Sequence, residues 1–159
     1  MLSFLDHALP EVYGYLFSRT RHTTTAEDLT SETMLAAVRS MNGRPPETLT
    51  VAWLIGIARH KLVDHWRRES RERRYLELVS NDRSAPGADV ELDVGCAHEA
   101  LARLNAAQRM ALTLRYVDGL PVAEVAALID RSVHATEKLL VRARASLRIR
   151  YRELDDSDE

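Results

Sequence analysis

The sequence has little cysteine, since Cys96 is the only one among 159 residues. A single cysteine excludes an intrachain disulfide, and without further Cys or His at ligand spacing it makes no structural zinc site. Free cysteines mostly behave as small apolar side chains, which is what we expect of Cys96. We therefore expect neither a metal nor a cofactor.

Long hydrophobic runs are also missing. The longest purely apolar runs are only a few residues, such as residues 53–58, far shorter than a membrane span requires. The N-terminal residues 1–6 lack the basic start and the small-residue cleavage site of a signal peptide. We expect a protein that acts in the cytoplasm without membrane insertion.

Motifs of known catalytic chemistry are missing as well. The chain contains six histidines and 24 acidic residues. None of them forms a His-Glu-x-x-His motif, and there is no phosphate-cradling glycine loop and no nucleophile elbow. The sequence therefore predicts a protein that is not an enzyme.

The net charge of -2 and the pI near 6.3 argue at first against a nucleic-acid partner. The basic residues, however, are concentrated in two segments. Residues 59–74 hold seven basic and three acidic side chains, a net of +4, and residues 131–152 hold seven basic and one acidic, a net of +6. A phosphate backbone responds to the local field, so these two segments are candidate nucleic-acid surfaces.

Helical periodicity dominates the chain, and no stretch alternates with a period of two, which predicts an all-α fold. In the first half we expect helices over residues 7–19, 25–41 and 50–78. Thr25 is the expected N-cap of the second helix, with Asp28 reaching back. The expected apolar face of the first helix is formed by Leu9, Val12, Tyr13, Leu16 and Phe17, that of the second by Leu29, Met34, Leu35 and Val38, and that of the third by Val51, Leu54, Ile55, Ala58, Leu62 and Trp66.

Polar, proline and glycine residues accumulate over residues 80–94, where the apolar periodicity fails. We therefore divide the chain into two small helical domains joined by a flexible linker. The first domain covers residues 1–79, the linker 80–97, the second domain 98–152, and an acidic disordered tail 153–159.

The second domain has the outline of a helix-turn-helix. Asn105 and Gln108 form a candidate capping box for a helix that closes at Asp118 and Gly119. A short helix follows over residues 122–129, and Pro121 is well suited to be its first residue. Ser132 then caps a longer basic helix that runs to about residue 151.

The last helix is the candidate reader of a DNA major groove. Its buried side is predicted to hold Val133, Leu139 or Leu140, Ala143 and Leu147. We expect Glu137, Lys138 and Arg142 to reach base edges, and Arg131, Arg144 and Arg148 to contact phosphates. The full predicted set is Arg131, Ser132, His134, Glu137, Lys138, Val141, Arg142 and Arg144. Taken alone, a basic amphipathic helix also fits a solvated surface helix.

Two groups of motifs carry a resemblance to a known family. Residues 26–35 (AEDLTSETML), 52–60 (AWLIGIARH) and 64–68 (DHWRR) resemble region 2 of the extracytoplasmic-function (ECF) group of sigma-70 factors. Residues 104–109 (LNAAQR), 114–120 (LRYVDGL), 123–126 (AEVA) and 141–145 (VRARA) resemble region 4 of the same group. The resemblance covers roughly residues 8–76 and 98–150, in the family's order.

This resemblance implies a transcription initiation factor whose partners are core RNA polymerase and promoter DNA. The family's activity is often held off by an anti-sigma protein, which is therefore a further candidate partner. The region 4 helix would recognise the minus-35 element. The region 2 helix over residues 50–78 would recognise and melt the minus-10 element through Arg59, His60, Lys61, Arg67, Arg68 and Arg71.

The family's polymerase-docking pattern falls on Asp28, Leu29, Glu32 and Leu35. The alternative is that these acids simply favour the positive end of a capped helix. Asp64 also matches a family position near the minus-10 strand, but we favour an ion pair with Arg68 for it. Trp53 and Trp66 lie on the apolar stripe, so core packing is the better interpretation than base stacking.

The sequence departs from the family's pattern at several positions. Residues 42–50 lack the aromatic side chains common in that loop, and His60 stands where Asn is frequent. Asp130 replaces the usual turn glycine, a change that Asp tolerates because it adopts left-handed geometry. Glu137 occupies a position where a base-reading Arg can occur. Glu137 could accept from cytosine N4 while Lys138 or Arg142 donates to guanine, which predicts a distinctive promoter preference.

The main rival hypothesis is a stand-alone helix-turn-helix regulator. In that reading, the N-terminal half senses a ligand or dimerises. It predicts specific duplex binding without polymerase, whereas the sigma-factor hypothesis requires binding to core polymerase.

Overall fold

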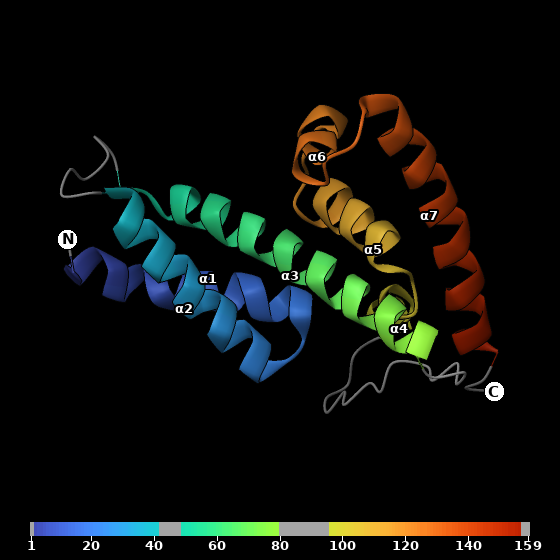
Figure 1. The fold of residues 1–159 in the computed structure, drawn as a ribbon, viewed down its shortest axis with the longest axis horizontal. Coiled ribbons are helices and arrows are strands. Elements are labelled where there is room, and N and C mark those ends of the chain that lie inside the picture. The colour runs from blue at the N-terminus through green and yellow to red at the C-terminus, as the bar shows by residue number, and fades with distance from the viewer. Residues whose placement is uncertain (1, 42–48, 80–95, 157–159) are drawn as a thin grey trace. The chain divides into compact units, whose positions relative to one another are not determined.

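The computed structural model describes residues 2–41, 49–79 and 96–156. Within these ranges the chain is helical, with no strand, which confirms the predicted all-α class (Figure 1). The elements are α1 (Leu2–Thr20), α2 (Thr23–Met41), α3 (Val51–Val79), α4 (Cys96–Ala102), α5 (Ala106–Leu112), the π-helix η1 (Thr113–Val117), α6 (Val122–Leu128) and α7 (Val133–Asp155).

The chain forms two compact units, Met1–His65 and Trp66–Glu159, with the division inside α3. Most of the predicted linker, residues 80–95, lies outside the described residues. The domain boundary inferred from composition therefore stays a prediction. No helix in the described ranges has the length and apolarity needed to cross a bilayer.

The first unit contains the hairpin of α1 and α2, which run side by side (Figure 1). The turn between them includes Arg21, whose φ of 54° reverses the chain. Val12 and Leu16 of α1 and Leu29 of α2 are among the fully buried side chains. The buried hydroxyl of Thr33 donates to the carbonyl of Leu29 at 2.7 Å. The hydrogen-bonding capacity of this hydroxyl as a donor is therefore satisfied within the core.

Four expectations for this hairpin are wrong. Helix α1 begins at Leu2 rather than near residue 7, and its Leu9 is 46% exposed instead of buried. Helix α2 begins at Thr23, so Thr25 lies inside the first turn and does not cap; its Oγ1 lies 3.4 Å from Nδ1 of His22. Leu35 and Val38 of α2 are about half exposed, so they do not belong to the core.

Helix α3 forms almost where the periodicity predicts it. Thr50 caps the helix, because its Oγ1 accepts from the backbone N–H of Trp53 at 3.2 Å. The predicted stripe is buried at Leu54, Ala58, Leu62 and Trp66, while Val51 and Ile55 are half-buried. Trp66 is 3% exposed, as its predicted core role requires, and Trp53 is half-buried.

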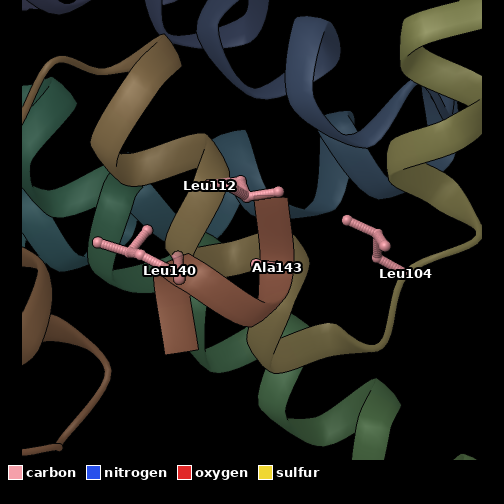
Figure 2. Packing of buried hydrophobic residues seen from close by; sticks show 5 residues of the cluster. Leu104, Leu112, Leu140 and Ala143 are labelled. Atoms are coloured by element: carbon pink, nitrogen blue, oxygen red, sulfur yellow. The ribbon is translucent and has the colours of Figure 1, made fainter. Parts of the chain in front are cut away.

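The core of the second unit lies where α4, α5 and α6 pack against α7. Its buried members are Leu104, Ala111, Leu112, Leu140 and Ala143, bordered by Leu101, Val122, Leu139 and Leu147. Figure 2 shows these buried members and labels four of them, which come from α5, from α7 and from the turn before α5. Leu140, Ala143 and Leu147 follow helical spacing along α7, which explains why that helix buries one side and exposes the rest.

Helix α5 begins with a side-chain cap and ends in a π-helical turn. Asn105 caps α5, since its side chain accepts from the Gln108 N–H at 2.9 Å. The predicted capping box is wrong in its second contact, the return of the Gln108 side chain to the Asn105 N–H. Nε2 of Gln108 donates instead to Oγ of Ser146 at 3.2 Å. The helix then continues as η1, and the chain reverses at Gly119 with a φ of +71°.

The helix-turn-helix is confirmed in α6 and α7. Asp130 has a φ of 56°, which is the left-handed geometry expected of it, and Ser132 caps α7 by accepting from Ala135 N–H at 3.1 Å. Two details differ. Val133 is 46% exposed, since it lies in the first turn before the core contacts begin. Helix α7 runs to Asp155, so the start of the predicted disordered tail is helical, with Leu154 buried.

Candidate nucleic-acid and polymerase interfaces

The side chains predicted to read the minus-35 element form an exposed surface at the start of α7 and in the turn before it. All eight are exposed: Arg131, Ser132, His134, Glu137, Lys138, Val141, Arg142 and Arg144. The opposite side of α7 is held by buried Thr136, Leu140 and Ala143. Packing of that side fixes which side chains face outward, so the first three turns of α7 present their polar side chains to solvent.

Three of these side chains, His134, Glu137 and Arg144, already have neighbours. Oε2 of Glu137 lies 4.0 Å from Nδ1 of His134, and both side chains are largely exposed. Such an exposed pair contributes little and leaves Glu137 available to another partner. Nη1 of Arg144 donates to the Tyr116 hydroxyl at 2.6 Å. Sequence reasoning missed Tyr116, because nothing local to η1 indicates a contact with a residue 28 positions away.

The predicted minus-10 residues all lie on α3, but their surroundings differ. In the first unit, Arg59 is half-buried, His60 is exposed, and Nζ of Lys61 lies 4.0 Å from Oε2 of Glu32. This ion pair places a predicted DNA-binding residue beside a predicted polymerase-docking residue.

In the second unit, Arg68 and Arg71 are exposed, as DNA contacts require. Arg67 is half-buried, and its Nη2 donates to the backbone carbonyl of Leu128 at 2.7 Å. This bond occupies one of the five N–H donors of the guanidinium and holds Arg67 partly inside the unit.

Sequence reasoning also missed Arg109, a largely buried arginine of α5. Its Nη2 donates to Oε2 of Glu69 at 3.1 Å, and its guanidinium carbon lies 5.5 Å from the ring centre of Trp66. Burial lowers the pKa of Arg109 from its ordinary value, while the charge of Glu69 works in the opposite direction. The pair and the ring contact hold a charged side chain inside the second unit.

The predicted polymerase-docking residues lie on α2 and divide into two groups. Asp28 and Leu35 are exposed and Glu32 is partly exposed, so these three can meet a partner. Leu29 is 2% exposed and packs in the core of the first unit. It therefore stabilises the position of α2 and cannot itself contact a partner. Val38, one turn beyond Leu35, adds a further exposed apolar side chain that the sequence placed in the core.

The described residues contain no group of three or more His, Cys, Asp or Glu side chains that could hold a metal ion. Residues 42–48, most of the loop that lacks the aromatic side chains common in the family, lie outside the described residues. The suggested ion pair between Asp64 and Arg68 stays a prediction.

Known proteins resemble the chain in both halves. Residues 4–72 match the family Sigma-70 region 2, and residues 95–147 match Sigma-70, region 4. The chain is 35% identical over 150 residues to the ECF RNA polymerase sigma factor BldN of Streptomyces coelicolor, covering 87% of this chain but only 55% of BldN. It is 34% identical over 134 residues to the ECF RNA polymerase sigma factor SigF of Caulobacter vibrioides, covering 81% of this chain and 72% of SigF.

A solved structure shares the fold. It is the sigma factor RpoE of Bartonella quintana in complex with the anti-sigma factor NepR, with a TM-score of 0.59 and 25% sequence identity. The similarity covers 94% of this chain and 95% of RpoE. The order of the two matched regions is the order predicted from the motifs.

Proposed function

Because the chain belongs to the extracytoplasmic-function group of sigma-70 factors, we propose that it binds core RNA polymerase through α2 and directs the polymerase to specific promoters through α3 and α7. The observation that carries this function is the presence of both sigma-70 regions in one chain. A stand-alone helix-turn-helix regulator would need only the second region. Acting with polymerase on promoter DNA places the protein in the cytoplasm as an initiation factor rather than an enzyme.

Helix α7 recognises the minus-35 element in the major groove. The support is its exposed polar side, with Glu137, Lys138 and Arg142 in the turns that can reach base edges. The surrounding arginines contact phosphates and contribute affinity that does not depend on sequence.

Helix α3 engages the minus-10 element. Exposed His60, Arg68 and Arg71 supply polar contacts to a single strand. Capture of an unstacked base offsets the free-energy cost of melting the duplex. Lys61 joins this set if its pair with Glu32 opens, which would couple polymerase docking to DNA engagement.

An anti-sigma protein is the proposed regulator. The support is the similarity to RpoE, which was solved in complex with NepR. Co-purification of an equimolar small protein from the native host tests this proposal, and a chain that is isolated alone and fully active would argue against it.

Core binding and promoter-directed transcription test the main proposal together. The purified chain is mixed with core polymerase, and the holoenzyme is used to select promoters from a random DNA library and then to transcribe them in a run-off assay. We expect a promoter-dependent product only when the chain is present. Specific duplex binding by the chain alone, with no affinity for core polymerase, would support the stand-alone regulator instead.

The docking surface gives a sharper version of this test. Asp28→Ala combined with Glu32→Ala should weaken core binding by at least about 30-fold, because each substitution removes a charged contact of about 1 kcal/mol or more. Glu11→Ala, which removes an exposed acid from α1, is the matched control and should bind normally. Equal affinities of all three proteins in a fluorescence titration with core polymerase would exclude α2 as the docking helix.

A further inference from the structure

A cluster outside the predicted DNA-binding set joins η1 to α7. The hydroxyl of Tyr116 accepts from Nη1 of Arg144 at 2.6 Å. The guanidinium carbon of Arg115 lies 5.8 Å from the ring centre of Tyr116. Arg115 is itself fixed, because its Nη1 donates to the carbonyl of Leu120 at 3.0 Å. Tyr116 therefore contacts two arginines, Arg144 through its hydroxyl and Arg115 through its ring.

The π-helix directs Tyr116 toward α7. The Asp118 N–H bonds the carbonyl of Thr113 at 3.0 Å, five residues back, so this turn contains one residue more than an α-helical turn. An extra residue rotates the following side chains around the helix axis, and such turns are frequent at functional sites. Tyr116 is 54% exposed although it is aromatic, so core packing does not account for its position.

The cluster retains its positive charge. Neither Arg115 nor Arg144 forms an ion pair with a carboxylate in the described part of the chain. Arg144 follows Glu137 by seven residues and Val141 by three, so the three side chains share one side of α7. Arg144 therefore lies on the same side of α7 as the proposed DNA-reading residues.

We propose that Tyr116 is a positioning residue that holds Arg144 in the orientation needed to contact a backbone phosphate of the minus-35 element. This inference rests on the proposed function of α7. A free arginine side chain loses much rotational freedom when it binds, and prior ordering removes part of that cost. A guanidinium has five N–H donors, so the bond to Tyr116 leaves donors for a phosphate.

Tyr116→Phe tests the proposal, because it removes the hydroxyl and keeps the ring beside Arg115. The assay measures the affinity of the complete holoenzyme for a selected promoter over a range of salt concentrations. The wild-type holoenzyme comes first: if it binds no promoter, the proposed function fails, whatever the variant does. With a binding wild type, we expect Tyr116→Phe to lower affinity about two- to tenfold, the cost of ordering one long side chain.

The dependence on salt separates positioning from direct contact. Arg144→Ala should reduce the slope of log affinity against log salt by about 1, because one phosphate contact is lost. Tyr116→Phe should leave that slope unchanged, because Arg144 still reaches the phosphate. In the Arg144→Ala background, Tyr116→Phe should have no further effect on promoter affinity.

Tyr151→Phe on α7 is the matched control and should leave promoter affinity unchanged. A Tyr116→Phe holoenzyme with wild-type affinity would overturn the proposal. So would an equal loss in the presence and absence of Arg144, since that result would assign the hydroxyl a role independent of this arginine. Thermal unfolding of each variant separates a loss of folded protein from a loss of affinity.

Discussion

Single side chains of α7 are expected to contribute to DNA binding in two chemically different ways. Arg142 lies among the turns that reach base edges, whereas Arg148 lies farther along the helix. A bidentate arginine on guanine carries sequence information, while an arginine on a phosphate contributes only charge. The two kinds of contact therefore leave different signatures when they are removed.

Arg142→Ala should reduce discrimination at one base pair of the minus-35 element by about 1–3 kcal/mol, since a base contact is lost. Arg148→Ala is its matched control, because it removes the same charged group from the same helix. It should weaken binding equally on all sequences and lower the salt slope by about 1. Holoenzyme affinities measured on a set of single-base variants distinguish these patterns, and identical profiles for the two variants would contradict the division of roles.

At the scale of an element, the turn between α6 and α7 decides where the recognition helix begins. Asp130 adopts a left-handed conformation, and Ser132 supplies the cap two residues later. Both are local features, and both were predictable from the sequence because a short polar side chain tolerates that conformation. The length of α7 was less predictable, since buried Leu154 extends it into an acidic segment.

Asp130→Val should lower the free energy of unfolding by about 1–2 kcal/mol, because a β-branched side chain is strained at positive φ. Asp130→Gly, at the same position, should not lower it, since glycine adopts this conformation without strain. Urea denaturation followed by circular dichroism provides the measurement. Equal stabilities of the two variants would show that the turn does not keep its left-handed geometry in solution.

At the scale of the whole molecule, the chain combines a net charge of -2 with two strongly basic segments, and it forms two compact units that divide within α3. The proposed docking surface lies on α2 in the first unit, and the proposed minus-35 reader lies on α7 in the second. Their targets are different macromolecules. Changes in one unit should therefore leave the binding step of the other intact.

Combining Leu35→Ala with Arg142→Ala tests this separation. Leu35→Ala should weaken core binding and leave the promoter preference of the assembled holoenzyme unchanged, while Arg142→Ala should do the reverse. The two free-energy changes should add within about 0.5 kcal/mol in the overall formation of the promoter complex, as independent sites do. A larger interaction energy, measured with a double-mutant cycle, would show that the two steps are coupled.

The sequence predicted the helical class, most helix ends and the outward-facing residues of α7, because these depend on nearby residues. It was less successful with α2, where Leu35 and Val38 read as core residues but are exposed. Periodicity identifies an apolar side chain, but it does not say whether the chain itself covers that side chain. In the sequence, an exposed apolar residue on a docking helix follows the same helical spacing as a buried one.

By itself the sequence determined the two sigma-70 regions, their order and the side of α7 that carries the polar readers, since helical spacing and caps act over a few residues. Only the tertiary structure decided which distant side chains meet. Tyr116 bonds Arg144 across 28 positions, Gln108 bonds Ser146 across 38, and Arg109 bonds Glu69 across 40. Such pairs depend on how helices pack and on a π-helical turn, and neither leaves a local pattern in the chain.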